Sequence, residues 1–395
     1  MKRKNLLLAL VLYIVSAAVS FGAFSYLGDQ QGTANIDNSE TEEETLLGAL
    51  LDIDPNAPRD QECPLNGQFY TAVEREAWEK RRPLAVMIEN HPEARPQAGL
   101  GDADVVFEAV AEGGVTRFMG MFYCDVQKID TTLAPIRSAR TYFVDWASGF
   151  NQPLYAHVGG ANVPGPSDAL GQINTYGWAG ENDLNQFSIG YPTFVRDYNR
   201  VPGKTIATEH TMVTSTEKLW EVGEERGWTN VSPERKVGFN MVGGDAWQDG
   251  FTPWTFENGD QPDGSVTSIS YDFWSGYNDY AVSWEYDPET NSYLRQMAGE
   301  PHIDQNSEKQ IMAKNVVVLK TVEKGPINEV KHMLYETIGT GDALIFKNGE
   351  AIEATWSKPT RTSPIQFVDS RGTNIPMARG LTWISVVNNV TTVEY

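Results

Sequence analysis

Two arginines and a serine that follow a proline form the most suggestive stretch of this chain. Residues 133–145 place Arg137 and Arg140 three positions apart, with Ser138 between them. We predict that Ser138 caps a helix, and residues three apart on a helix share a face. Two rigid donor groups beside a helix N-terminus suit a carboxylate or a phosphate. The stretch therefore predicts a receptor for an anion.

Other arginines of the same region extend this predicted ligand-binding set. Arg117 and Arg95 are included as ligand-binding candidates, because some arginines of this domain are expected at strand ends or helix starts. A purely structural alternative stays open, because arginines also pair with nearby acids inside a fold. The acids that could compete with a ligand for these guanidinium groups are Glu108, Glu112 and Asp145.

Histidines and a glutamate supply candidates for acid–base chemistry. His91, His157 and His210 each fall where a strand or loop should end, and the catalytic candidates are Glu112, His157 and His91. The competing interpretation is a histidine that hydrogen-bonds to the backbone. The histidine spacing matches no metal motif such as H-E-x-x-H, and no phosphate-binding loop or dinucleotide fingerprint occurs. We therefore predict no metal and no cofactor.

Composition limits the class of protein. A chain of 395 residues suggests about two domains. The apolar content of 41% is that of a folded protein. A net charge of −22 argues against binding to nucleic acid, which needs a basic surface.

The N-terminus predicts attachment to a membrane. Lys2, Arg3 and Lys4 precede an uncharged apolar run, and we expect residues 1–28 to form an anchor that contacts the membrane through residues 5–27. The positive-inside rule keeps the N-terminus cytoplasmic and the body outside. A cleaved signal peptide, which would leave the body secreted, is the alternative. Residues 29–62 are strongly acidic and are expected to form a disordered linker.

The two cysteines, Cys63 and Cys124, form no C-x-x-C pair and have no metal-ligand spacing. A disulfide between them suits an oxidising compartment, and two unpaired thiols are the alternative. The sequence alone does not decide between these two states.

The remaining chain predicts an α+β fold with two domains. Residues 63–242 should form an α/β-type domain with buried strands and flanking helices, because near-continuous apolar runs alternate with helical patterns. Strands are expected at 83–88, 104–111, 115–123 and 154–158, and helices at 71–81 and 138–148. A capping-box pattern at 214–217 should start a further helix that runs to residue 226.

Residues 243–395 should form a mostly β domain, because short strand patterns alternate there with turns. The expected strands are residues 266–271, 280–286, 293–296, 315–321, 343–346, 351–356, 365–368 and 382–387.

Several sequence blocks in order resemble the YerB-like family of bacterial envelope proteins (DUF3048, N- and C-terminal domains). In the first domain they include Arg82-Pro-Leu-Ala-Val-Met-Ile-Glu-Asn-His91, Glu112-Gly-Gly-Val-Thr-Arg-Phe118 and Pro135-Ile-Arg-Ser-Ala-Arg140. In the second they include Trp284-Glu-Tyr-Asp287, Pro301-His-Ile-Asp304 and Gly380-Leu-Thr-Trp-Ile384. Many members look like lipoproteins, whereas no cysteine follows the apolar segment here. The chain also has Glu209-His-Thr-Met where relatives tend to have a His-Asn pair. The resemblance implies an envelope-facing two-domain protein and no particular activity.

These observations together predict a single-pass membrane protein of the bacterial cell envelope with an extracytoplasmic body. Its expected partners are the membrane and an anionic envelope ligand or protein, bound in an arginine-rich cleft of the first domain. Two alternatives stay open. One is a hydrolase or transferase that acts on a cell-wall polymer, and the other is a structural interaction protein without a small-molecule site.

Overall fold

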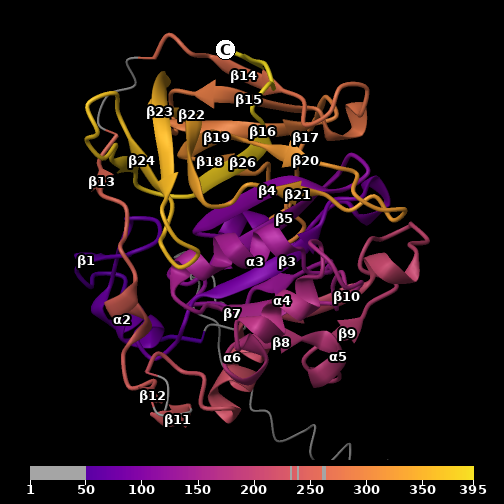
Figure 1. Ribbon diagram of the computed structural model, residues 1–395. Coiled ribbons are helices and arrows are strands. Elements are labelled where there is room, and N and C mark those ends of the chain that lie inside the picture. Colours follow the sequence, from indigo (N-terminus) through magenta and orange to yellow (C-terminus); the bar gives the residue numbers. More distant parts are fainter. Residues whose placement is uncertain (1–49, 232–233, 238–239, 260–263) are drawn as a thin grey trace, which may run out of the picture. The chain divides into compact units, whose positions relative to one another are not determined.

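A mixed sheet of ten strands forms the centre of the computed structural model, which describes residues 50–231, 234–237, 240–259 and 264–395 (Figure 1). In spatial order the strands are β24 (Gln366–Val368), β23 (Glu350–Lys358), β22 (Gly339–Lys347), β19 (Asn315–Thr321), β26 (Thr382–Asn388), β4 (Val105–Glu112), β5 (Val115–Phe122), β3 (Leu84–Glu89), β7 (Leu154–His157) and β8 (Asp183–Asn185).

The apolar runs form these strands because both faces of the sheet are covered. Every residue of β3 is buried, and so is nearly every residue of β4 and β5. Such burial suits near-continuous apolar sequences rather than alternating ones. The strands predicted at 83–88, 104–111, 115–123 and 154–158 are therefore confirmed.

Strands from both predicted domains share this sheet. β26 pairs in parallel with β4, with Thr382 opposite Val105, and on its other side in parallel with β19. The eight strands predicted in the second half are also present, so the α+β class with a β-rich C-terminal region is confirmed. What the sequence did not predict is that several of them continue the sheet of the first half.

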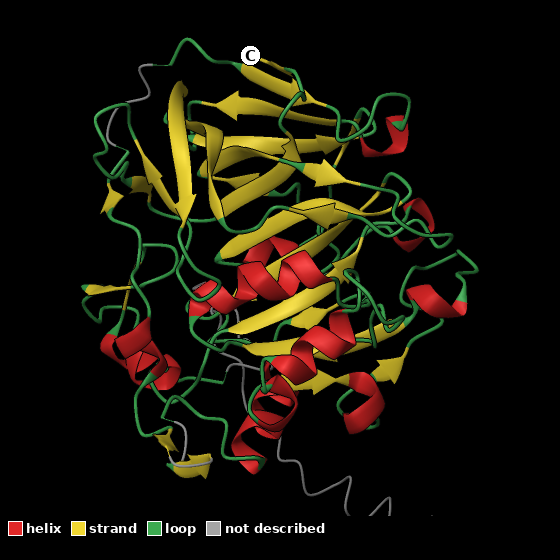
Figure 2. Ribbon diagram, in the orientation of Figure 1, coloured by secondary structure: helices red, strands yellow, loops and turns green. Residues whose placement is uncertain are grey.

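Short helices lie over the strands that come from the N-terminal half of the chain (Figure 2). Among them, α3 and α4 contact each other. The α-helices are α2 (Ala72–Trp78), α3 (Thr141–Ala147), α4 (Ala169–Thr175), α5 (Gln186–Ile189) and α6 (Thr216–Glu225). The 3₁₀ helices are η1 (Pro92–Ala94), η2 (Leu100–Asp102), η3 (Ser148–Phe150), η4 (Trp178–Gly180), η5 (Thr208–His210), η6 (Trp247–Gly250) and η7 (Asn278–Tyr280).

Helix α6 forms as predicted, but its capping box does not. Ser215 is the N-cap residue, and its hydroxyl donates to Asp130 Oδ2 at 2.9 Å. The backbone N–H of Glu217 donates to the other oxygen of Asp130 at 3.0 Å. A carboxylate distant in sequence thus replaces the local cap. Among the described helices, a complete capping box is formed by Thr71 and Glu74 at the start of α2.

A second sheet packs against the strands contributed by the C-terminal half. Its strands are β17 (Glu300–Pro301), β16 (Ser292–Met297), β15 (Val282–Asp287), β14 (Ser268–Tyr271) and β27 (Val393–Glu394), with β18 (Met312–Ala313) paired to β16. Trp284 of β15 and Trp383 of β26 meet edge to face, with ring centroids 5.6 Å apart. Both side chains are fully buried, so they join the two sheets in one core.

Smaller sheets complete the described strands. A three-stranded sheet contains β6 (Thr132–Leu133), β10 (Met212–Ser215) and β9 (Val195–Arg196). The two-stranded pairs are β1 (Gln61–Glu62) with β2 (Phe69–Tyr70), β11 (Arg235–Val237) with β12 (Asn240–Val242), β13 (Phe256–Glu257) with β25 (Met377–Ala378), and β20 (Glu323–Lys324) with β21 (Leu334–Tyr335).

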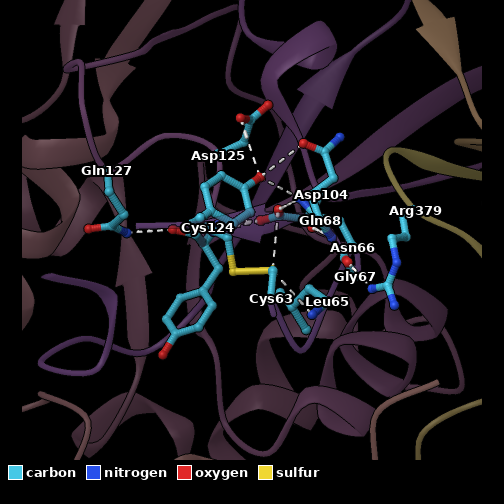
Figure 3. The surroundings of a disulfide bond; sticks show 12 residues. Cys63, Leu65, Asn66, Gly67, Gln68, Asp104, Cys124, Asp125, Gln127 and Arg379 are labelled. Atoms are coloured by element: carbon cyan, nitrogen blue, oxygen red, sulfur yellow. Dashed lines mark hydrogen bonds between the residues drawn. A yellow bond between two sulfur atoms is a disulfide. The ribbon is translucent and has the colours of Figure 1, made fainter. Parts of the chain in front are cut away.

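Cys63 and Cys124 form a disulfide in the buried core (Figure 3). The carboxyl group of Asp104 lies beside it and accepts hydrogen bonds from Asn66 Nδ2 and from the backbone N–H groups of Tyr123 and Cys124. The structure thereby decides in favour of the bridged form of the two cysteines. Among the described residues, no cationic side chain pairs with this buried acid.

The last part of the predicted linker is ordered. Leu50 donates its backbone N–H to the carbonyl of Lys128 at 2.9 Å, and β1 pairs with β2. Here the structure differs from the predicted disordered linker 29–62, because strand pairing next to Cys63 holds residues that could not fold alone. The earlier residues of the linker lie outside the described part of the chain.

None of the helices that the structure describes is both long enough and apolar enough to cross a membrane. The predicted membrane segment, residues 5–27, lies outside the described residues.

Candidate functional site

The predicted site residues gather where β3, β7 and β8 end. These three strands run parallel, and their last residues are Glu89, His157 and Asn185. Ligands of open α/β sheets commonly bind outside the carboxyl ends of such strands. The start of β5 lies at the same edge, because Arg117 is opposite Glu89 in the strand register.

The segment that carries Arg137 and Arg140 is extended rather than helical. The N–H of Arg137 donates to the carbonyl of Met87 at the end of β3, and that of Ala139 donates to Gly159 after β7. These bonds lay the segment across the strand ends. Helix α3 begins only at Thr141, with Arg140 as its N-cap residue in an extended conformation.

Two predictions about this segment are therefore wrong. Ser138 does not cap the helix, and Arg137 and Arg140 do not share a helical face, because both precede the first helical residue. The carbonyl of Ser138 instead accepts a hydrogen bond from Arg117 Nη1 at 2.8 Å. Backbone pairing with the neighbouring strands outcompetes the local helix signal.

Two of the predicted arginines share one carboxylate. Arg117 Nη2 lies 2.7 Å from Glu112 Oε1, and Arg140 Nη2 lies 2.6 Å from Glu112 Oε2. Arg140 donates to the same Oε2 through Nε at 3.2 Å. The two guanidinium groups are almost wholly buried, whereas the Glu112 side chain keeps 27% of its surface exposed. Glu112 is therefore the competitor that neutralises much of this arginine cluster.

The ionisation of Glu112 follows from this geometry. Burial raises the pKa of its carboxyl group, but the guanidinium groups of Arg117 and Arg140 outweigh burial and lower the pKa to about 2. A carboxylate fixed in its ionised form cannot donate a proton near neutral pH. Glu112 is consequently a poor general acid.

Arg137 has different contacts. Its Nε lies 3.1 Å from Glu89 Oε1, and its side chain is 27% exposed. The other oxygen of Glu89 accepts from His210 Nδ1 at 2.7 Å. Neither terminal nitrogen of Arg137 makes a hydrogen bond within the described part of the chain, so these donors are free to bind an anion.

The structure gives Arg95 and His157 structural contacts. Arg95 donates to the side chain and carbonyl of Asn90 and to the carbonyl of Asp279, and it lies over the ring of Tyr280. His157 is fully buried between the carbonyl of Gly159 and Asp183 Oδ1, with both contacts at 2.6 Å. Its ring nitrogens are thus both occupied.

His91 lies at the rim of the same region. It is the N-cap residue of η1, where its Nδ1 accepts from the N–H of Glu93. Its ring stacks on that of His210, with centroids 5.0 Å apart and an interplanar angle of 13°. His91 is therefore close to Arg137 through His210 and Glu89, and it is far better exposed than His157.

The other two predicted competitors pair elsewhere. Asp145 accepts from Gln172, Tyr176 and Thr337, and burial raises its pKa. Glu108 is fully buried against Arg295. Sequence reasoning missed Glu89 as the partner of Arg137, although its place at the end of a buried strand was a usable signal.

Neither of two pockets in the described part of the chain contains a predicted arginine. One of about 590 Å³ lies next to α3 and is lined by residues such as Asp145, Gln172 and Tyr176. Another, of about 400 Å³, is lined by Arg82, Arg226 and Trp228 among others. The candidate site is thus an exposed edge at Arg137 and not one of these two pockets.

Two family models match the chain over most of the fold. Residues 70–229 match the N-terminal domain of the protein family of unknown function DUF3048, and residues 269–384 match its C-terminal domain. The chain therefore belongs to this two-domain family, as the sequence blocks predicted.

A curated relative and a solved structure agree with this assignment. The chain is 28% identical over 345 residues to the Bacillus subtilis (strain 168) protein named "Putative lipoprotein YerB", covering 84% of this chain and 88% of that protein. The crystal structure of the YerB protein from Bacillus subtilis matches with a TM-score of 0.65 and 25% identity, over 85% of this chain and 100% of that chain.

Proposed function

We propose that the protein is held at the bacterial cell membrane by residues 5–27, with its body in the envelope, where it binds an anionic ligand through Arg137. Support for the location comes from the basic and apolar N-terminal sequence and from the lipoprotein named among the relatives. The disulfide agrees with it, because such bonds persist mainly in oxidising compartments.

The observation that carries the ligand proposal is that the two terminal guanidinium nitrogens of Arg137 (below, its fork) make no hydrogen bond in the described part of the chain. Glu89 Oε1 lies 3.1 Å from Nε of Arg137 without forming a hydrogen bond, and in the described part of the chain both terminal nitrogens keep their donors. A guanidinium group presents parallel donors that match a carboxylate or a phosphate. Arg117 and Arg140 contribute a positive potential nearby, although Glu112 takes their direct hydrogen bonds.

The chemistry of the ligand follows from this arrangement. One exposed fork at the edge of a sheet suits a terminal carboxylate of a peptidoglycan stem peptide or a phosphate of a teichoic-acid chain. Both present the same bidentate anion to Arg137. A protein partner would present an aspartate or glutamate side chain there instead.

A binding experiment tests the proposal. Calorimetric titration of the full-length chain with a muropeptide, and separately with a glycerol-phosphate oligomer, should give saturable binding in one case. Arg137→Ala should weaken it by about tenfold or more, which corresponds to a lost charge-assisted hydrogen bond. Arg137→Lys should retain part of the affinity, because it keeps the charge without the fork.

Arg371→Ala is the matched control, since it removes an arginine that is 88% exposed elsewhere in the fold. Binding that survives Arg137→Ala unchanged would refute the site. Failure of both ligands to bind would favour an interaction protein without a small-molecule site.

The hydrolase or transferase alternative has less support. His157 is buried with both nitrogens engaged, and Glu112 is held ionised by two guanidinium groups. Of the three predicted catalytic candidates, His91 and Glu112 are partly exposed and His157 is buried.

A further inference from the structure

Two histidines and a glutamate converge beside Arg137 from distant parts of the chain. His91 and Glu93 belong to the turn that follows β3, and His210 ends η5. One potential ligand atom of each residue lies within 4.8 Å of the others. Two imidazoles and a carboxylate are a ligand set that zinc and related cations use in proteins.

The contact with Glu89 favours one tautomer of His210. Glu89 Oε2 lies 2.7 Å from Nδ1 of His210. When Nδ1 donates to this carboxylate, the lone pair of a neutral ring is on Nε2. A carboxylate behind a histidine in this way is the usual support of a metal ligand. Arg200 Nε donates to the carbonyl of His210 at 2.9 Å and holds its backbone.

The free nitrogen of His210 lacks a hydrogen-bond partner in the described part of the chain. The side chain is only 5% exposed, and the carboxylate oxygen that faces Nε2, Oε2 of Glu93, lies 3.7 Å away. That distance is too long for a hydrogen bond but leaves room for an ion between the two atoms. A cation could bridge the ring nitrogen and this carboxylate oxygen.

His91 completes the set from the opposite side. Its ring is stacked nearly parallel to that of His210, and one nitrogen of each ring belongs to the ligand atoms that lie within 4.8 Å of one another. Because an imidazole lone pair lies in the plane of its ring, one ring must turn out of the stack when both bind one ion. In the structure His91 Nδ1 accepts a long hydrogen bond of 3.3 Å from the N–H of Glu93. Ligation through Nε2 would move the ring proton to Nδ1 and break that long hydrogen bond. A metal–imidazole bond readily exceeds the cost of losing it.

The local charge also favours a cation. Glu89 and Glu93 contribute two carboxylates, and the exposed carboxylate of Glu209 interacts electrostatically with His210 and His91. Arg137 and Arg200 oppose them with two positive charges. The three carboxylates therefore outnumber the two guanidinium groups around the three ligands.

We propose that His91, Glu93 and His210 bind a divalent transition-metal ion such as zinc. Glu93 is 67% exposed, so the site opens to solvent and water would complete a four-coordinate shell. The inference stands apart from anion binding by Arg137, because it uses different side chains and a different ligand.

Metal titration tests this site directly. After treatment with a chelator, the full-length chain should bind one Zn²⁺ per chain by calorimetry. With Co²⁺ as a probe, binding should produce a visible absorption band from imidazole and carboxylate ligands. His91→Gln and Glu93→Gln should each weaken Zn²⁺ binding about tenfold or more, as the loss of one of three ligands predicts.

Glu76→Gln is the matched control for lost charge, because Glu76 is 76% exposed and lies on α2. It should leave the affinity unchanged. Glu93 is exposed, so its variant should fold, and far-UV circular dichroism would check both site variants. No binding by the wild-type chain at micromolar Zn²⁺, or binding that neither site variant weakens, would overturn the proposal. Neither result depends on whether Arg137 binds an anion.

Discussion

The two ends of β4 carry carboxyl groups that behave in opposite ways. Asp104 immediately precedes the strand and is fully buried, with three N–H donors around it. Burial raises its pKa to about 8, because no cationic side chain pairs with it in the described residues. Glu112 ends the strand, where two guanidinium groups lower its pKa to about 2 despite burial. Nearby charge, more than depth, decides the state of each acid.

In the middle of the same strand, the buried carboxyl group of Glu108 is compensated in a third way, by a fully buried ion pair. Glu108 is fully buried and pairs with Arg295 at 2.6 Å. Trp383 and Thr116 donate to the remaining carboxylate positions. The Arg295 guanidinium lies over the rings of Trp383 and Trp284, with centroid distances of 4.5 and 5.5 Å. This pair has no route to solvent, so its role is structural, whereas the Glu112 cluster reaches the surface.

Breaking the central pair should have the largest effect. Arg295→Met leaves Glu108 as an uncompensated buried charge, and such losses cost about 3–5 kcal/mol of unfolding free energy. Urea unfolding followed by circular dichroism would measure the change. Adding Glu108→Gln should recover part of the loss, since the buried charge is then gone. A single variant as stable as wild type would show that the pair does not hold β4 to the second sheet.

The amino end of β4 should make stability fall as pH rises. The pKa of Asp104 is about 8 in the folded state, above its value in the unfolded chain. The stability that Asp104 contributes is therefore fully present below the unfolded pKa and is lost as the pH rises to about 8. One such group changes stability by about 1.4 kcal/mol per pH unit. In Asp104→Asn, the unfolding free energy measured from pH 6 to pH 8 should no longer show this decrease with pH. An unchanged slope would mean that Asp104 is ionised in the fold.

The carboxyl end should show the reverse dependence on pH. Glu112→Gln removes the partner of buried Arg117, and we expect a loss of about 1–2 kcal/mol at pH 7 because the carboxylate is partly exposed. A lowered folded pKa stabilises the fold above the unfolded value near 4.5, and this gain disappears as pH falls toward 2. The difference in unfolding free energy between the wild type and Glu112→Gln should therefore be smaller at pH 3 than at pH 7. An equal difference at both pH values would contradict the assigned ionisation of Glu112.

The exposed fork should matter least for stability. Arg137→Ala removes a partly exposed guanidinium group from buried Glu89, which keeps His210 as a hydrogen-bond partner, so the expected loss of unfolding free energy is about 1 kcal/mol. Thermal unfolding of this variant, compared with Arg371→Ala, would measure the difference. A loss as large as that of Glu112→Gln would assign Arg137 to the scaffold and remove the basis for a ligand site.

Local sequence patterns predicted most strands and missed most pairings at the site. β3, β4 and β19 consist of near-continuous apolar residues that are almost all buried, so the sequence alone predicted where these strands lie in the chain. The cap at Ser138 failed because Arg137 and Ala139 bond to strands that are distant in sequence. No local pattern indicates such bonds.

The site contacts show the same limit. Glu112 was named as a competitor because it lies near Arg117 in sequence. Glu89 and His210 come together from positions 121 residues apart, and no spacing rule connects them. The pairing of β26 with β4 is equally remote, which is why the shared sheet was not predicted.

That last pairing has a consequence for synthesis. β4 obtains one neighbour from the adjacent hairpin with β5, but the other is β26, near the end of the chain. A ribosome must translate Thr382–Asn388 before the second edge of β4 can be covered. Until then the nascent chain carries an apolar strand with open backbone groups, the feature through which chains aggregate. A nonsense mutation just before this strand would therefore yield a substrate for chaperones and proteases rather than a shorter working protein.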